Sequence, residues 1–151
     1  RQSTVALLGG YWRGPSRGAD ATRAYTVIGL AGSPVFTTCG GPAAVLSPTF
    51  GYIVGFTFCA LAVGFLANRI RQRNALTAYL IMLAGLVCLY VPGLVWLYEV
   101  LRHVSNAPPN IARVLETGLF IPFAGDLLKT VPAAVIGPRV RGFLERRDAR
   151  F

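Results

Sequence analysis

Charged side chains are scarce in this sequence. They make up 14% of the 151 residues, whereas soluble domains carry about 25%. Hydrophobic residues reach 54%, and the mean hydropathy is +0.53, so the composition indicates a membrane protein. The net charge of +9 does not favour nucleic acid as a partner, because no face interleaves basic and aromatic residues. A membrane surface fits the basic residues better, since they lie between apolar stretches.

Catalytic and metal-binding patterns are missing as well. His103 is the only histidine, and a metal site needs several ligands. The three cysteines, Cys39, Cys59 and Cys88, match no zinc or redox motif. Cys59 and Cys88 lie in apolar runs, where thiols pack as small hydrophobes. No phosphate-binding loop and no nucleophile beside a base is present. We therefore expect neither an enzyme nor a bound cofactor.

Long uncharged segments are the main feature that the sequence does have. Residues 47–68 and 75–98 carry no charge, and each is long enough to cross a hydrocarbon core, which takes about 20 residues. A third span is expected at 117–138. Two shorter segments, 2–12 and 19–36, precede these spans. The sequence thus predicts an all-α, polytopic bundle of transmembrane helices.

The basic residues predict how this bundle is oriented. No signal peptide is visible in the sequence. A tight turn at 13–18 and a charged turn at 69–74 are expected on the same side of the membrane as the C-terminus. That side carries eleven of the 15 basic residues: Arg13, Arg17, Arg23, Arg69, Arg71, Arg73, Arg139, Arg141, Arg146, Arg147 and Arg150. Because basic loops stay cytoplasmic, we expect outward loops at 33–48 and 99–112 in a cell (inner) membrane protein. A transmembrane substrate-binding domain would cover 1–138, and 139–151 would form a basic cytoplasmic tail.

Asp126 and Lys129 are the only charges in the third span. At a spacing of three, both side chains share one helix face. A lone charge at membrane depth costs about 2.5–3.5 kcal/mol on insertion scales, and such residues are a functional site by default. An ion pair that only holds helices together is the alternative. Pro122 and Gly125 predict that a helix begins just before Asp126, where the positive helix end would favour the carboxylate.

A second group of residues lies at the outward start of the first long span, where residues 47–56 read SPTFGYIVGF. Gly51 and Gly55 form a pair of small residues that lets helices approach closely. Thr49 and Tyr52 are candidates to present hydrogen-bonding groups to a ligand, although aromatic residues in such segments also serve as core or interface anchors.

These residues carry a resemblance to a known family. SPTFGYIVGF at 47–56 resembles the GPTGGYLLGF region of the biotin S components of energy-coupling-factor (ECF) transporters, the BioY family. PFAGDLLK at 122–129 is similar to that family's FxPGDLLK motif, and RQSTVALLGGYWRGPSRGA at 1–19 resembles LQTLAVLLAGLLLGPRLGA. The resemblance covers essentially the whole chain. It departs from the family at Ser47 and Phe50, where the family has glycine, and the bulk of Phe50 is expected to narrow a pocket.

The resemblance implies a bundle of six helices that captures biotin near the outer face. The family's first helix is expected to be absent here, which leaves about five helices and predicts weak biotin binding by this stretch alone. The family implies that Asp126 and Lys129 bind the ligand and that Gln2 lies near the site. It also implies a transmembrane coupling subunit and cytoplasmic ATPases as partners. The alternatives are an S component for another vitamin and a structural membrane protein outside transport.

Overall fold

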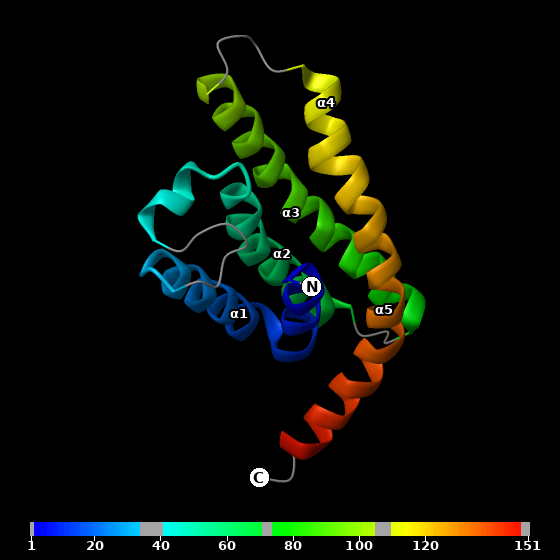
Figure 1. Cartoon of the computed structure of the whole chain (residues 1–151). Helices are drawn as coiled ribbons and strands as arrows, with labels where there is room; N and C mark the ends of the chain where they lie inside the picture. The colour runs from blue at the N-terminus through cyan, green and yellow to red at the C-terminus, as the bar shows by residue number, and fades with distance from the viewer. Residues whose placement is uncertain (1, 34–40, 71–73, 105–109, 149–151) are drawn as a thin grey trace.

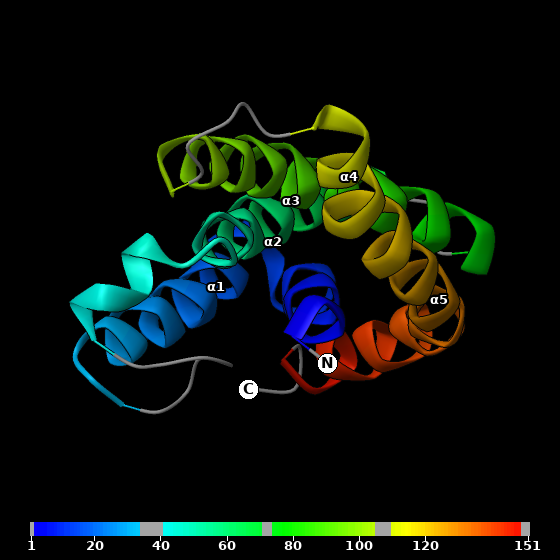
Figure 2. The same ribbon diagram turned by 45° about the horizontal axis from the view of Figure 1, so that its top comes forward.

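The structure, a computed structural model, describes residues 2–33, 41–70, 74–104 and 110–148. Over these ranges the secondary structure is helical and contains no strand. Figure 1 shows the helices side by side, and Figure 2 shows them arranged in an arc with the first half of α1 on its concave side. The predicted all-α fold is therefore confirmed.

Helix α1 (Gln2–Leu30) consists of two helical segments joined at a sharp bend. Gly14 stands at the bend with φ 81° and ψ 178°, a conformation that favours glycine. Pro15 follows and removes a backbone donor. The sequence placed a turn at 13–18, and the bend confirms it. The second segment packs closely on α2, where a Cβ atom added at Gly64 would lie only 2.6 Å from the Cα of Pro15.

Three helical stretches are long and apolar enough to cross a membrane among the residues described. They are α2 (Phe50–Arg69), α3 (Ala75–Val104) and a continuous rod. The rod comprises α4 (Ile111–Leu115), the π-helical turn η2 (Glu116–Phe120) and α5 (Ile121–Asp148). A short 3-10 helix, η1 (Pro42–Leu46), precedes α2. The three predicted spans are confirmed, and with the two segments of α1 they give five helical rods.

The continuity of the rod contradicts one expectation about the third predicted span. No helix begins just before Asp126, because α4, η2 and α5 follow one another without a break from Asn110, which caps α4 with its side chain. The amide of Ile121 donates to the carbonyl of Glu116, and this wider π turn accommodates the ring of Pro122. A helix N-terminus therefore does not stabilise the carboxylate of Asp126. The rod also continues past residue 138, so the predicted tail starts as helix.

Small residues bring α2 and α3 together. A Cβ atom at Gly51 would lie 2.8 Å from the carbonyl oxygen of Pro92, and one at Gly55 would lie 3.1 Å from the main-chain carbon of Leu89. The interpretation of these glycines as packing residues is confirmed. Cys59 is fully buried in the core and Cys88 is partly buried, while Cys39 lies outside the described residues.

A polar clasp closes the end of the bundle where the C-terminus lies. The buried Arg141 on α5 donates from Nη1 to the carbonyl of Tyr11 on α1, at 3.0 Å. It also donates from Nη2 to Oδ1 of Asn68 on α2, at 2.7 Å. Because one guanidinium serves acceptors on two other helices, this clasp fixes the relative positions of α1, α2 and α5.

Candidate ligand-binding cavity

A cavity of about 680 Å³ lies between α1, α2, α3 and the rod. Small-molecule sites usually measure about 300–1,000 Å³ and combine apolar walls with a few polar groups. Apolar side chains such as Ile53, Phe56 and Leu89 form much of the wall. The polar groups come from four different helical elements, so the site exists only in the folded bundle.

The carboxylate of Asp126 is the centre of the polar groups. Its Oδ1 accepts a hydrogen bond from the hydroxyl of Ser3 at 2.8 Å and one from the ammonium of Lys129 at 3.1 Å. Its Oδ2 accepts from the hydroxyl of Tyr90 at 3.0 Å. Asp126 is buried, and the hydroxyl of Thr130 donates to its backbone carbonyl at 2.7 Å. Donors from α1, α3 and α5 therefore fix this carboxylate.

Lys129 differs from Asp126 in its exposure. Its side chain is 48% exposed, compared with 11% for that of Asp126. One ammonium proton points to the carboxylate, and an ammonium carries three donors. Lys129 can therefore keep its ion pair with Asp126 and still donate to a molecule in the cavity.

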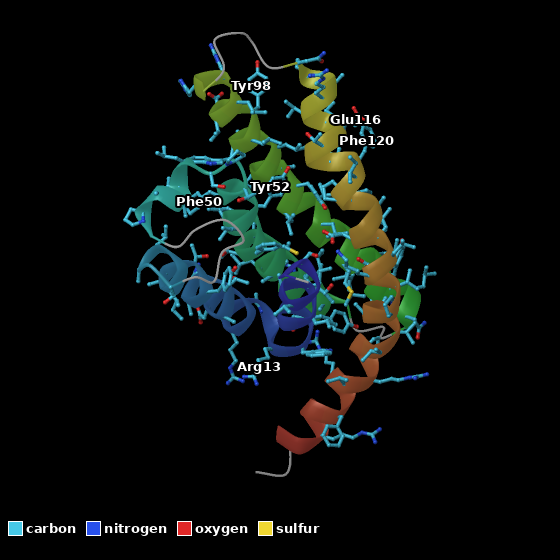
Figure 3. The ribbon with its side chains drawn as sticks, in the orientation of Figure 1. Arg13, Phe50, Tyr52, Tyr98, Glu116 and Phe120 are labelled. Carbon is cyan, nitrogen blue, oxygen red and sulfur yellow. The ribbon has the colours of Figure 1, made fainter. Side chains whose placement is uncertain are left out.

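Tyr52 joins α2 to the π turn in the wall of the cavity. Its hydroxyl donates to the carbonyl of Gly118 at 2.7 Å. In Figure 3 the side chain of Tyr52 lies far from that of Arg13. A Cβ atom at Gly118 would lie 2.9 Å from this hydroxyl oxygen, so a larger residue would disturb the contact. The ring of Tyr52 meets that of Tyr90 edge-on, with centroids 5.9 Å apart. This aromatic contact connects the π turn to the carboxylate network.

Thr49 lines the rim of the cavity next to Pro48. Its hydroxyl lies 2.9 Å from that of Ser47, while Trp96 donates from Nε1 to the carbonyl of Ser47 at 3.2 Å. The expectation that Phe50 narrows the pocket is wrong. Phe50 is not part of the cavity lining, because its ring packs against that of Trp96 with centroids 5.7 Å apart.

The predicted site residues whose side chains the structure describes lie together in one place. Asp126, Lys129, Tyr52 and Thr49 all line the cavity. Gln2 begins α1, but its side chain lies outside the described residues.

Sequence reasoning missed the roles of Ser3 and Tyr90. Ser3 stands beside Gln2 in the segment that resembles the family, and this proximity was the available clue. Tyr90 is one of several tyrosines in apolar helices, and nothing in its spacing sets it apart. Among the described residues, no cluster of His, Cys, Asp or Glu could hold a metal ion.

Apolar spanning helices around a cavity of this size, with polar groups gathered on one carboxylate, define an integral membrane protein that binds a small molecule. A family model described as the BioY family matches residues 1–146. The chain belongs to the BioY family.

The relatives and a solved structure agree with this assignment. A probable biotin transporter BioY of Methanothermobacter thermautotrophicus is 34% identical over 133 residues, which cover 86% of this chain and 82% of the relative. The probable biotin transporter BioY of Lysinibacillus sphaericus is 30% identical, and the match covers 92% of this chain and 71% of the relative. The crystal structure of the S-component for biotin from an ECF-type ABC transporter superposes with a TM-score of 0.76 at 28% identity, covering 93% of this chain and 73% of that chain.

Proposed function

We propose that this protein is the membrane-embedded substrate-binding subunit that captures biotin from outside the cell for uptake by an ECF-type transporter. The observation that carries the proposal is the cavity built around Asp126 and Lys129 in a chain whose relatives are named biotin transporters. No chemical step on the ligand and no cofactor is part of it. A transmembrane coupling subunit and cytoplasmic ATPases would complete the transporter.

The chemistry of biotin matches the polar groups of the cavity. Biotin has two ureido N–H donors, a ureido carbonyl and a carboxylate tail. A carboxylate has about four acceptor positions, and three of those of Asp126 are occupied by the donors Ser3, Lys129 and Tyr90. Oδ2, which has Tyr90 as its one donor here, can accept a ureido N–H. The ammonium of Lys129 can donate to an oxygen of the ligand, and such charge-assisted hydrogen bonds are strong.

Three further residues are proposed to complete the site. Tyr52 and Thr49 would contact the ligand from α2 and its rim, and Gln2 would reach it from the start of α1. The proposed orientation puts the rim near Thr49 outside and the C-terminus in the cytoplasm, because the basic residues gather at the other end of the bundle.

Equilibrium binding of labelled biotin to the purified protein in lipid nanodiscs tests the proposal. We expect saturable binding that unlabelled biotin abolishes and that thiamine and riboflavin leave unchanged. Asp126→Asn should weaken it. The matched control is Asp20→Asn, since Asp20 is exposed and lies outside the cavity. Absence of saturable binding, or equal competition by another vitamin, would contradict biotin as the ligand.

A further inference from the structure

The side chain of Tyr52 lies between two glycines that belong to other helices. A Cβ atom added at Gly93 on α3 would lie 2.6 Å from Cε1 of the ring, and one added at Gly118 in η2 would lie 2.9 Å from the hydroxyl oxygen. Real Cβ atoms do not approach other atoms so closely, so glycine at each position leaves the room that Tyr52 needs. The ring is thus enclosed by α3, and the hydroxyl is enclosed by the rod.

Pro122 explains why the carbonyl of Gly118 is free to accept a bond from Tyr52. In an α-helix, this carbonyl would accept from the amide of residue 122, four positions later. Proline has no N–H, so that bond is absent, and the hydroxyl of Tyr52 donates to the carbonyl at 2.7 Å. Gly118 is buried, and a buried carbonyl without a donor is unfavourable. The bond from Tyr52 therefore compensates for the missing amide of Pro122.

The position of Tyr52 matters for the cavity because Tyr52 forms part of its wall. Its ring meets that of Tyr90 edge-on, and the hydroxyl of Tyr90 donates to Oδ2 of Asp126. Tyr90 also meets Phe123 edge-on, with ring centroids 5.5 Å apart. A displacement of Tyr52 would therefore disturb the donor on Oδ2, the oxygen that is proposed to accept a ureido N–H.

We propose that Pro122 and Gly93 are positioning residues for ligand binding and that they act through Tyr52. They hold its ring and hydroxyl in the cavity wall before a ligand arrives. A side chain that is fixed in advance loses little freedom on binding, which lowers the cost of association. This role rests on the proposed function, since Tyr52 then contacts the bound biotin.

Another proline of α5 provides a matched control. Pro132 also lacks an N–H, so the carbonyl of Leu128 has no helical donor four positions later. Leu128 is 76% exposed and is not part of the cavity lining. Pro132→Ala therefore restores a helical amide in the same rod without a change in the wall of the cavity.

The biotin affinity of Pro122→Ala, measured alone and combined with Tyr52→Phe, tests this role. The new amide would bond to the carbonyl of Gly118 and draw it toward the rod axis, away from the hydroxyl of Tyr52. We expect Kd to rise about threefold to tenfold, the equivalent of one neutral hydrogen bond. In the Tyr52→Phe background the same change should alter Kd by less than about twofold, and Pro132→Ala should leave the wild-type Kd unchanged. Equal losses in both backgrounds, or no loss in either, would overturn the proposal.

A spectroscopic measurement without biotin reports the position of Tyr52 directly. The chain is labelled with 3-fluorotyrosine, and the fluorine resonance of Tyr52 is identified by its loss in Tyr52→Phe. We expect this resonance to shift in Pro122→Ala and in Gly93→Ala, but not in Pro132→Ala. Gly142→Ala is the control for Gly93→Ala, because a Cβ atom there would meet no described atom of another helix within 4 Å.

The two measurements separate this proposal from the proposed function. A resonance that stays in place in both Pro122→Ala and Gly93→Ala would overturn the positioning role, even if biotin binds. Gly93→Ala keeps the test valid if Pro122→Ala fails to fold. Absence of biotin binding by the wild-type chain would contradict the proposed function instead, and the resonance would still show whether Pro122 holds the ring of Tyr52.

Discussion

Replacement of the two charged residues in the cavity separates a binding role from a packing role. In Asp126→Asn one oxygen is kept as an acceptor, and the new amide group can donate to the hydroxyl of Tyr90. Most hydrogen bonds of the network can therefore persist, while the negative charge beside Lys129 is lost. We expect biotin affinity to fall by about 1.5–3 kcal/mol, the usual value of a hydrogen bond to a charged group, which is about tenfold to a hundredfold in Kd.

The structure also sets the expected change in stability. Removal of one partner of a buried ion pair can cost about 3–5 kcal/mol when the remaining charge has no other partner. Here Lys129→Met leaves Asp126 with the hydroxyl donors of Ser3 and Tyr90, and the lysine is half exposed. Exposed ion pairs contribute about 0–1 kcal/mol. We therefore expect Lys129→Met to lower the free energy of unfolding by only about 1 kcal/mol while it weakens biotin binding.

The assay measures thermal unfolding and biotin affinity for Asp126→Asn, Lys129→Met and the double variant in the same nanodiscs. A binding role predicts folded single variants with weak binding that the double variant does not restore. Unchanged affinity in Asp126→Asn, together with lost stability that the double variant regains, would refute the reasoning and leave a packing role for the pair.

Three further predictions test the wall, the clasp and the orientation of the bundle. Tyr52→Phe removes the donor to the carbonyl of Gly118, so we expect a loss of about 1 kcal/mol in the free energy of unfolding and weaker biotin binding; identical thermal unfolding would show that the bond contributes nothing. Arg141→Met leaves two acceptors without their donor, and we expect chemical denaturation to show a loss of about 1–3 kcal/mol with biotin affinity little changed. In a background without native cysteines, Ala112→Cys should react with an impermeant thiol reagent in intact cells and Ala75→Cys should not; the reverse pattern would invert the proposed topology.

The spans and the bend of α1 could be predicted from the sequence because they depend on local properties. Uncharged length fixes the spans, and Gly14 followed by Pro15 fixes the bend. The unbroken rod could not be predicted, because Pro122 and Gly125 are typical of a helix boundary when they are considered alone. The π turn that accommodates them depends on its neighbours, including the hydrogen bond from Tyr52 to Gly118.

The candidate site shows the same limit. Asp126 and Lys129 stand out because charge is rare in a span. Ser3 and Tyr90 are 123 and 36 residues from Asp126 in the sequence, and a hydroxyl in an apolar helix has no periodic pattern that would single it out. Their role follows from tertiary packing, which the family resemblance suggested only in outline.

Because the α4–η2–α5 rod is continuous, a movement at one end of it is transmitted to the other end. Asp126 and Arg141 lie on the same helix, about 22 Å apart at 1.5 Å per residue. Asp126 lines the cavity, and Arg141 holds α1 and α2 at the opposite end of the bundle. A ligand that tilts the helix at Asp126 therefore displaces the clasp unless α5 bends at Pro132 or Pro138, so the two prolines set how much of the motion is transmitted.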